Sequence, residues 1–542
     1  MLATDLLTAG VILLTHRGLD AGLGRFTHLD DDDYAHPFLS ARSLRDPLRA
    51  ALVVLPWLGL GVGKLRGWEG LGDGILDFRR LGLLLAATLV WEELTAPRNA
   101  YFRRSYAADR LLTLAFLVAA AWHPVFLFGM LAAWTPLVWQ VKHPRCFRLG
   151  LHPRVDKSLP LCVLTLILAA SLCAQVVEVG AGLLTTLVLA AVASHYVIPA
   201  LAKLQLGPYP GSWVLRNRLS HLIITMNNYG WQRRRASSEQ ALRWARRLRR
   251  LDPWLCGGAL LVEIGAAAIL VDRDVALVLL VAFISLHLGI LAASGIFFWK
   301  WLPVSALLLV EIGRLDGPRR AAVFSDEHLI LSLGVLAISS FVLRPFWLGW
   351  WDMPLNHFFR VTGTGASGRD YSIPSQCLAP YDQVFGQTTF GFLVHQRLLV
   401  GAMGGYETTG PEGRRVIAAV ERCATPEQAR ELCRALGRSW YDERDAACFA
   451  RFLRRVFAEA SRRPRSRLLG ALAPPHHFQF SCRAPEYRGQ EPLESLAVAE
   501  RSTFFDGERI HSLRRQTVLR VRIPSAESLD AGARVDCGHA TG

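Results

Sequence analysis

The stretch that decides the fold runs from residue 158 to residue 204 and reads SLPLCVLTLILAASLCAQVVEVGAGLLTTLVLAAVASHYVIPALAKL. It holds two apolar runs, 158–177 and 182–204, separated by a short turn at Glu178. Each run has about the 20 apolar residues that a helix needs to cross a bilayer. The outer ends of this hairpin meet basic loops, 142–157 and 205–253. Because basic loops favour the cytoplasmic side, we expect both loops there and the Glu178 turn on the opposite side.

The rest of the first two thirds of the chain is similarly apolar. The 542 residues are 51% hydrophobic, with a mean hydropathy of +0.25, which is too apolar for a soluble enzyme of this size. The run 111–141 is one long helix or two short ones meeting at His123-Pro124, and the run 275–312 divides near Ser294-Gly295. Further runs lie near 48–63, 81–96, 254–271 and 328–351, so we expect about eight spans.

The composition changes after WWDMPLNHFF, residues 350–359. We therefore expect a membrane all-α helical bundle of about eight transmembrane helices in residues 1–350, followed by a smaller, soluble α+β domain in residues 351–542. In that domain, Thr425 followed by Pro426 predicts a helix start, and Gly437 predicts its end. TVLRVRI (517–523) alternates apolar and basic residues, which is typical of a half-buried strand.

The net charge of +16 indicates that the membrane half interacts with anionic lipid. SSEQALRWARRLRRL (237–251) predicts a basic amphipathic helix that lies among the headgroups, with a calmodulin-binding or nucleic-acid-binding helix as the alternative. The chain holds no nucleic-acid-binding motif, so we expect the lipid bilayer as partner and no nucleic acid. Its ten cysteines lack zinc-ligand spacing, so we expect no metal. LLTAGVILLTHRG (6–18) lacks a basic start and a cleavage site, so insertion is expected to depend on internal spans in the cell membrane.

Ionisable groups inside apolar runs are candidates for function because burying them in a bilayer is unfavourable. The candidates are Glu92, Glu93, His123, His195, Lys203, Glu263 and His287. Each has a structural alternative: groups near span ends reach the headgroups, and histidines form hydrogen bonds between helices. Glu263 lies in mid-span and must be protonated or paired. Burial would make the neutral amine of Lys203 available as a base, with His195 about 12 Å away beyond a bend at Pro199.

Three segments carry a family resemblance. HYVIPALAKLQLG (195–207) with the following Ser-Trp pair, WHPVFLFGML (122–131) and VTGTGASGRDYSIPSQCLAPYD (361–382) resemble segments of the vitamin K-dependent γ-glutamyl carboxylases. That family belongs to the wider group with a horizontally transferred transmembrane (HTTM) domain. The similarity in order and spacing covers about residues 100–390. The carboxylases have adjacent lysines where this chain has Lys203 alone, and their chemistry faces the lumen, whereas Lys203 is expected near a cytoplasmic loop.

The resemblance implies chemistry with a reduced quinone of the vitamin K type, O2 and CO2. It implies that Lys203 is the base that starts the reaction, that His123 stabilises an oxyanion or adjusts the lysine, and that a peptide or protein glutamate is the substrate. The first hypothesis is therefore a quinol-coupled carboxylase or epoxidase. The alternative is a non-enzymatic HTTM membrane protein that assists the maturation, export or immunity of a partner polypeptide. A transporter, suggested by Glu263 and the histidines, is a third.

Overall fold

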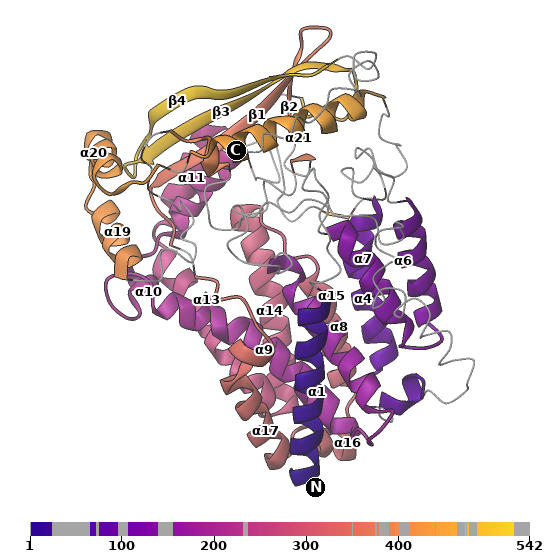
Figure 1. Ribbon diagram of the computed structural model, residues 1–542. Coiled ribbons are helices and arrows are strands. Elements are labelled where there is room, and N and C mark those ends of the chain that lie inside the picture. Colours follow the sequence, from indigo (N-terminus) through magenta and orange to yellow (C-terminus); the bar gives the residue numbers. More distant parts are fainter. Residues whose placement is uncertain are drawn as a thin grey trace, which may run out of the picture.

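A computed structural model describes residues 2–23, 66–71, 75–95, 107–138, 155–230, 237–349, 351–373, 411–439, 441–462 and 485–524, and short pieces within 377–399 and 472–475 (Figure 1). A bundle of helices forms the lower part of the molecule in that view, and a small sheet lies above it. The expected apolar run 48–63 lies outside the described residues. The chain is mostly helical with one antiparallel four-stranded sheet in its C-terminal region, which confirms the coarse fold class.

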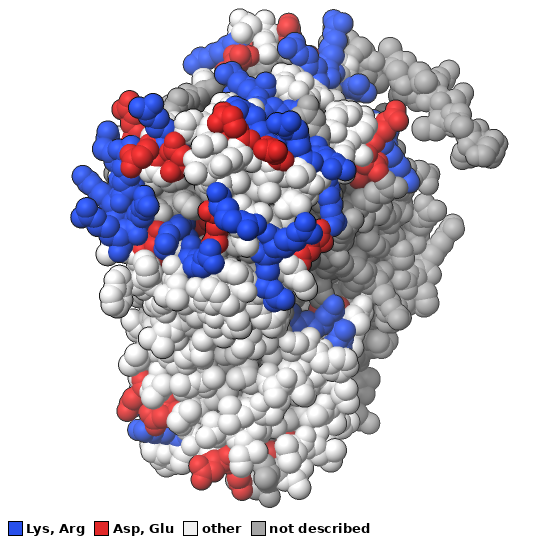
Figure 2. All heavy atoms as spheres, turned by 90° about the vertical axis from the view of Figure 1, so that its left-hand side faces the viewer, with Lys and Arg blue, Asp and Glu red and all other residues white. Residues whose placement is uncertain are grey.

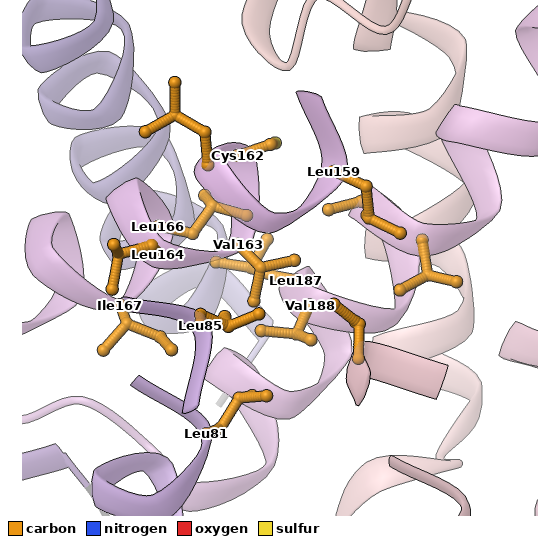
Figure 3. Packing of buried hydrophobic residues seen from close by; sticks show 14 of the residues in the cluster. Leu81, Leu85, Leu159, Cys162, Val163, Leu164, Leu166, Ile167, Leu187 and Val188 are labelled. Carbon is orange, nitrogen blue, oxygen red and sulfur yellow. The ribbon is translucent and has the colours of Figure 1, made fainter. Parts of the chain in front are cut away.

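The centre of the bundle is the apolar hairpin of residues 158–204. Its helices are α8 (Val155–Cys173) and α9 (Ala181–Leu204), and 89% and 94% of their apolar windows are buried. In Figure 3, Val163 and Ile167 of α8 lie close to Leu187 of α9 and Leu85 of α4 (Phe78–Thr95). All four side chains are fully buried. Such a helix pair, apolar on every side, is stable only with other helices around it.

The helices around this hairpin begin and end at breaks that can be recognised in the sequence. The run 111–141 forms two short helices, α6 (Ala107–Ala120) and α7 (Phe126–Val138), on either side of the His123-Pro124 break. The run 275–312 divides at Gly295, whose φ of 71° ends α14 (Arg273–Ser294) before α15 (Trp301–Gly313). The remaining elements of the bundle are α1 (Leu2–Leu23), η2 (Trp68–Leu71), α10 (Ser212–Arg216), α11 (Leu219–Tyr229), α12 (Ser238–Leu248), α13 (Asp252–Gly265), η3 (Ala266–Leu270), α16 (Gly317–Val323), α17 (Asp326–Ala337) and α18 (Ser339–Val342).

The described residues contain four helical segments long and apolar enough to cross a membrane, where about eight were expected. These are Val155–Cys173, Gly182–Leu204, Asp252–Leu270 and Arg273–Ser294. Helices α7 and α15 are apolar but shorter. The run 328–351 is interrupted at Ile338, where α17 ends and the four-residue α18 follows. Counting apolar runs therefore gave too many long helices, because a run can remain apolar across a point where one helix ends and another begins.

The sheet has the strand order β2-β1-β3-β4, with every neighbouring pair antiparallel. Its strands are β1 (Leu355–Gly365), β2 (Asp370–Ser372), β3 (Leu493–Phe505) and β4 (Ile510–Arg522), so the strand predicted at 517–523 is confirmed. Helix α21 (Glu443–Arg462) packs on β3 and β4 and buries Phe449, Leu453 and Phe457 (Figure 1). Helices α19 (Pro411–Glu421) and α20 (Pro426–Leu436) and the short η5 (Gly391–Leu393) complete this part; Thr425 caps α20 as predicted.

The sheet packs directly on the bundle. The Tyr229 hydroxyl at the end of α11 donates a hydrogen bond of 2.6 Å to the carbonyl of His357 in β1. Asn228 donates another, of 3.0 Å, to the Thr503 hydroxyl in β3. The predicted basic helix is present as α12, and it buries Ala241 and Ala245 beside α11. The change of composition near residue 350 therefore coincides with a change of architecture, and packing continues across it.

The surface divides into bands of different charge. Figure 2 shows basic side chains gathered over the upper part of the molecule, a broad band without charge below it, and a second charged zone at the lower end. The uncharged band includes α13 and α14, whose windows are only 33% and 22% buried and which expose large apolar side chains such as Leu261 and Val278. An exposed apolar surface of this extent indicates contact with lipid or with another protein.

Candidate functional site

The end of α9 places Lys203 in the interior of the bundle. Its ammonium forms an ion pair with the carboxylate of Glu263, which α13 presents from the opposite side. The Lys203 Nζ also lies 5.2 Å from the centre of the Trp213 ring, within the range of a cation–π interaction. The two charged side chains are 6% and 9% exposed. Glu263 is thus paired, one of the two states that its mid-span position required.

Two further candidates, His195 and His287, lie beside this pair, together with Tyr196, which was not among the candidates taken from the sequence. The Tyr196 hydroxyl and the His287 Nε2 are 2.8 Å apart, which joins α9 to α14 by a hydrogen bond. The His195 Nδ1 lies 2.8 Å from the carbonyl of Ala191 one turn earlier in α9. The Trp301 indole packs edge-on against all three rings, with centroid distances of 5.3–5.9 Å. Pro199 has no N–H to donate to the carbonyl of His195, which loosens α9 at this point.

These side chains line one small cavity. Lys203, Glu263, His195, Tyr196 and His287 all contribute to its wall, and its volume is about 40 Å³. A cavity of this size holds a few water molecules, since one water needs about 10–15 Å³ by this measure. Four half-buried apolar residues form its outer rim, namely Leu286, Ile290, Phe346 and Leu348. The cavity therefore lies just inside the surface of the bundle, behind an apolar rim.

His123 is not brought into this cavity. It lies in the break between α6 and α7, where its Nδ1 accepts a hydrogen bond of 3.2 Å from the N–H of Val125. Its side chain is buried, and its Nε2 has no hydrogen-bond partner in the described part of the chain. The structure thus assembles Lys203, Glu263, His195 and His287, and leaves His123 as a local cap at the start of α7.

A second cluster of buried charges lies on the same helix hairpin. At the start of α8, the Lys157 Nζ lies 2.6 Å from the Glu93 carboxylate and 3.4 Å from that of Glu92. Lys300 lies 2.8 Å from Glu92 and also pairs with Asp156. The structural alternative for Glu92 and Glu93, in which groups near span ends reach the headgroups, does not hold in this fold. Because α4, α8 and α15 pack on one another, both carboxylates point into the bundle, where lysines neutralise them.

The lysines of this cluster were missed because residues 142–157 were taken for a basic loop. A signal for them exists in the composition: only five of the 61 basic side chains are lysines. The three lysines among the described residues are all buried and paired with carboxylates. Arginine carries the basic surface of this chain, so a lysine here indicates a position where a compact charge fits among packed helices.

Asp352 lies between the Lys203 pair and the sheet. Its backbone N–H donates to the Asn217 side-chain oxygen at 2.7 Å, and the Asn217 amide donates back to its carboxylate at 3.0 Å. Burial raises the pKa of the Asp352 carboxyl to about 7, although the Asn217 hydrogen bond and the charge of Lys203 act in the opposite direction. The protonation of this carboxyl therefore changes near neutral pH.

No protein-family model, curated protein or solved structure matches this chain. The site must accordingly be judged by its own chemistry. A carboxylate, an amine, two imidazoles and a phenol converge on one cavity, and all five are groups that can accept or release protons.

Proposed function

We propose that this chain is a multi-pass protein of the cell membrane. Helix α14 has 22 residues, so it is about 33 Å long and matches the hydrocarbon core of a bilayer, which is about 30 Å thick. The exposed apolar faces of α13 and α14 would contact the lipid. The arginines of α12 lie at one end of this band, and Asp272 and Arg320 pair at the other. Since basic residues favour the cytoplasmic side, the sheet would lie in the cytoplasm.

We further propose that the bundle is an intramembrane acid–base site, with Lys203 as the base and Glu263 as its proton partner. The observation that supports this is their buried ion pair in the wall of a small, mostly apolar cavity. When the ammonium gives a proton to the carboxylate, both charges disappear from a low-dielectric interior, and a neutral amine is left facing the cavity. That amine accepts a proton from a weakly acidic O–H or C–H group. Tyr196 and His287 are placed to stabilise the resulting anion.

A reduced quinone, which the family resemblance implies, does not fit this cavity. Its volume of about 40 Å³ is far below the roughly 300–1,000 Å³ of ordinary ligand pockets. His123, the second expected participant, does not line it. We therefore derive no step through a quinone. Carboxylation of a peptide, in which a reduced quinone would supply the electrons that O2 takes up, is left to the activity assay below.

The test uses the full chain in nanodiscs. The background is Asp352→Asn, which removes a carboxyl whose own protonation changes near neutral pH. In this background, infrared spectra recorded over a pH titration should show a protonated-carboxyl band that is lost in Glu263→Gln and altered in Lys203→Met, because the two residues share a proton. The matched control is Glu427→Gln, an exposed surface carboxylate on α20, which should leave that band unchanged. An unchanged band in Glu263→Gln would contradict proton sharing at the pair.

The activity arm supplies a reduced quinone, O2, CO2 and a glutamate-containing peptide. Any oxygen uptake or carbon fixation by the wild type should be abolished by Lys203→Ala and not restored by Lys203→Arg, because arginine cannot act as a neutral base. Turnover that survives in Lys203→Ala would overturn the assignment of the base. No turnover together with no proton exchange at the pair would favour the alternative, a non-enzymatic HTTM protein that assists a partner polypeptide.

A further inference from the structure

A second, larger cavity lies where the bundle meets the sheet. Its volume is about 330 Å³, within the range of ordinary ligand pockets. Its walls come from α10, α11, α12, the end of α19 and the turn between β3 and β4, so segments from residue 216 to residue 507 meet around it. It shares no lining residue with the Lys203 cavity, so the two are separate sites.

Four arginines line this cavity: Arg216, Arg218, Arg246 and Arg249. Arg216 forms an ion pair of 2.5 Å with Glu421, and Arg246 forms one of 3.0 Å with Glu508. Within the described part of the chain, Arg218 and Arg249 have no carboxylate oxygen within 4.0 Å. Arg218 donates one hydrogen bond of 3.1 Å to the carbonyl of Leu215, which leaves most of its donors available.

The acidic residues of the same wall are already occupied. Glu421 is paired with Arg216. Asp506 accepts hydrogen bonds of 2.7 Å from the backbone N–H groups of Glu508 and Arg509, and its carboxylate lies 2.6 Å from the His511 ring. Asp352 is bound by Asn217 through one carboxylate oxygen. The cavity therefore presents two guanidinium groups that form no ion pair within 4.0 Å in the described part of the chain, although the charge of Arg218 acts on Glu421 and the charges of Arg218 and Arg249 act on Asp252.

A glycine in the lining of the cavity holds Arg249 against the turn between β3 and β4. Gly507, in the turn between β3 and β4, has a φ of +100°, which side chains rarely adopt. A Cβ atom at this position would lie 3.5 Å from the Arg249 Nη1, so the guanidinium of Arg249 lies directly against this turn. Asp352 also lines the cavity, and its buried Oδ1 has no hydrogen-bond partner among the described residues.

We infer that this cavity binds a phosphate group, held by the guanidinium groups of Arg218 and Arg249. Guanidinium forms two parallel hydrogen bonds with phosphate oxygens, which is why arginine is preferred at phosphate sites. The phosphate belongs to an anionic lipid headgroup or to a small soluble molecule. The cavity lies where the bundle meets the sheet, and Figure 2 shows Lys and Arg side chains gathered over the upper part of the molecule, above the uncharged band.

Binding to the full chain in nanodiscs of neutral phosphatidylcholine tests this inference. The probes are radiolabelled inorganic phosphate and a short-chain phosphatidic acid, at about 150 mM salt, which screens diffuse attraction. The variant is Arg218→Gln/Arg249→Gln. Its matched control is Arg243→Gln/Arg250→Gln, which removes the same charge from exposed positions of α12 and the turn after it that do not line the cavity.

We expect the wild type and the control to bind alike, and the cavity variant to bind at least tenfold more weakly. Inorganic phosphate binding identifies a soluble ligand, and binding of phosphatidic acid alone identifies a lipid headgroup; both support the site. Equal weakening in the two double variants would overturn it, as would a wild type that binds neither probe. If Arg218→Gln disturbs the fold, Arg249→Gln alone, at an exposed side chain, should still weaken binding severalfold.

Discussion

At the scale of single residues, the pair of Lys203 and Glu263 places two charged groups in a closely packed interior with little access to water. Two charges taken into a bundle lose their hydration, and their mutual attraction offsets this loss only while both are present. The Trp213 ring, 5.2 Å from the ammonium, adds attraction from one side. The pair is therefore sensitive to the loss of one partner and tolerant of the loss of both.

Glu263→Gln should accordingly destabilise the fold by about 3–5 kcal/mol, because it leaves a buried ammonium unpaired. Adding Lys203→Met should recover most of that loss, since methionine fills a similar volume without charge. Thermal unfolding in nanodiscs measures both. Glu427→Gln, which breaks an exposed pair with Arg430, should change stability by less than about 1 kcal/mol. A double variant no more stable than Glu263→Gln would contradict the pairing.

Asp352 predicts a dependence of stability on pH. Burial raises its pKa from 3.8 to about 7, so between these values the folded state keeps a proton that the unfolded state has lost. Stability from this group therefore falls as pH rises from about 4 to about 7 and is level above, a change on the order of 4 kcal/mol. Asp352→Asn should remove this change. The measurement is the difference in unfolding free energy between variant and wild type at about pH 5 and about pH 8; a difference independent of pH would contradict it.

The residues of the site were only partly predictable. Glu263 and Lys203 stand out because an isolated charge in an apolar run demands a partner, and each proved to be the other's. His195 and His287 were found for the same reason. Lys157 and Asp156 were not, since they stand at the edge of an apolar run, where sequence alone does not distinguish the first turn of a buried helix from a loop. The pairing partners themselves depend on which helices pack together.

At the scale of elements, two helices begin with the same device. Ser237 caps α12 and Thr425 caps α20, each with a glutamine three residues later that completes a capping box. Ser237→Ala should therefore destabilise α12 by about 1 kcal/mol and increase hydrogen exchange at its first amides. Thr425→Ala is the matched control and should act on α20 alone. If exchange in α12 were unchanged in Ser237→Ala, packing against α11 would be holding this helix without its cap.

The elements were predictable where the chain carries local stop signals. His123-Pro124 and Gly295 divide apolar runs because proline and a left-handed glycine end helices whatever surrounds them. The strands were harder to predict. Residues of β1 pair with residues of β3 that lie 128 to 149 positions later, as in Phe358 with Arg501, and no local pattern encodes such a pairing. Helix α1 was not expected as a span. It carries the charged residues Asp5, Arg17 and Asp20, and it is not among the four helical segments that are long and apolar enough to cross a membrane.

At the scale of the whole molecule, the proposed orientation rests on how charge is distributed. The arginines of α10 and α12 lie at the junction with the sheet. At the other end of the exposed apolar band, Asp272 and Asp274 at the start of α14 are paired with Arg320 and Arg273. If that band spans the bilayer, the two ends must lie on opposite sides. Arg488, near the start of β3, and Asp274, in the first turn of α14, are exposed positions on the two ends.

We expect Asp274→Cys to react with a membrane-impermeant maleimide in intact cells, and Arg488→Cys to react only after the membrane is permeabilised. The background for both is the chain with its ten native cysteines replaced by serine or alanine. The physical reason is the positive-inside rule, which retains the arginine-rich end in the cytoplasm. If Arg488→Cys reacts in intact cells and Asp274→Cys reacts only after permeabilisation, the orientation is the opposite of the proposed one, but the band still crosses the bilayer. Labelling of both positions in intact cells would instead mean that the apolar band does not cross the bilayer. The exposed apolar faces of α13 and α14 would then contact another protein.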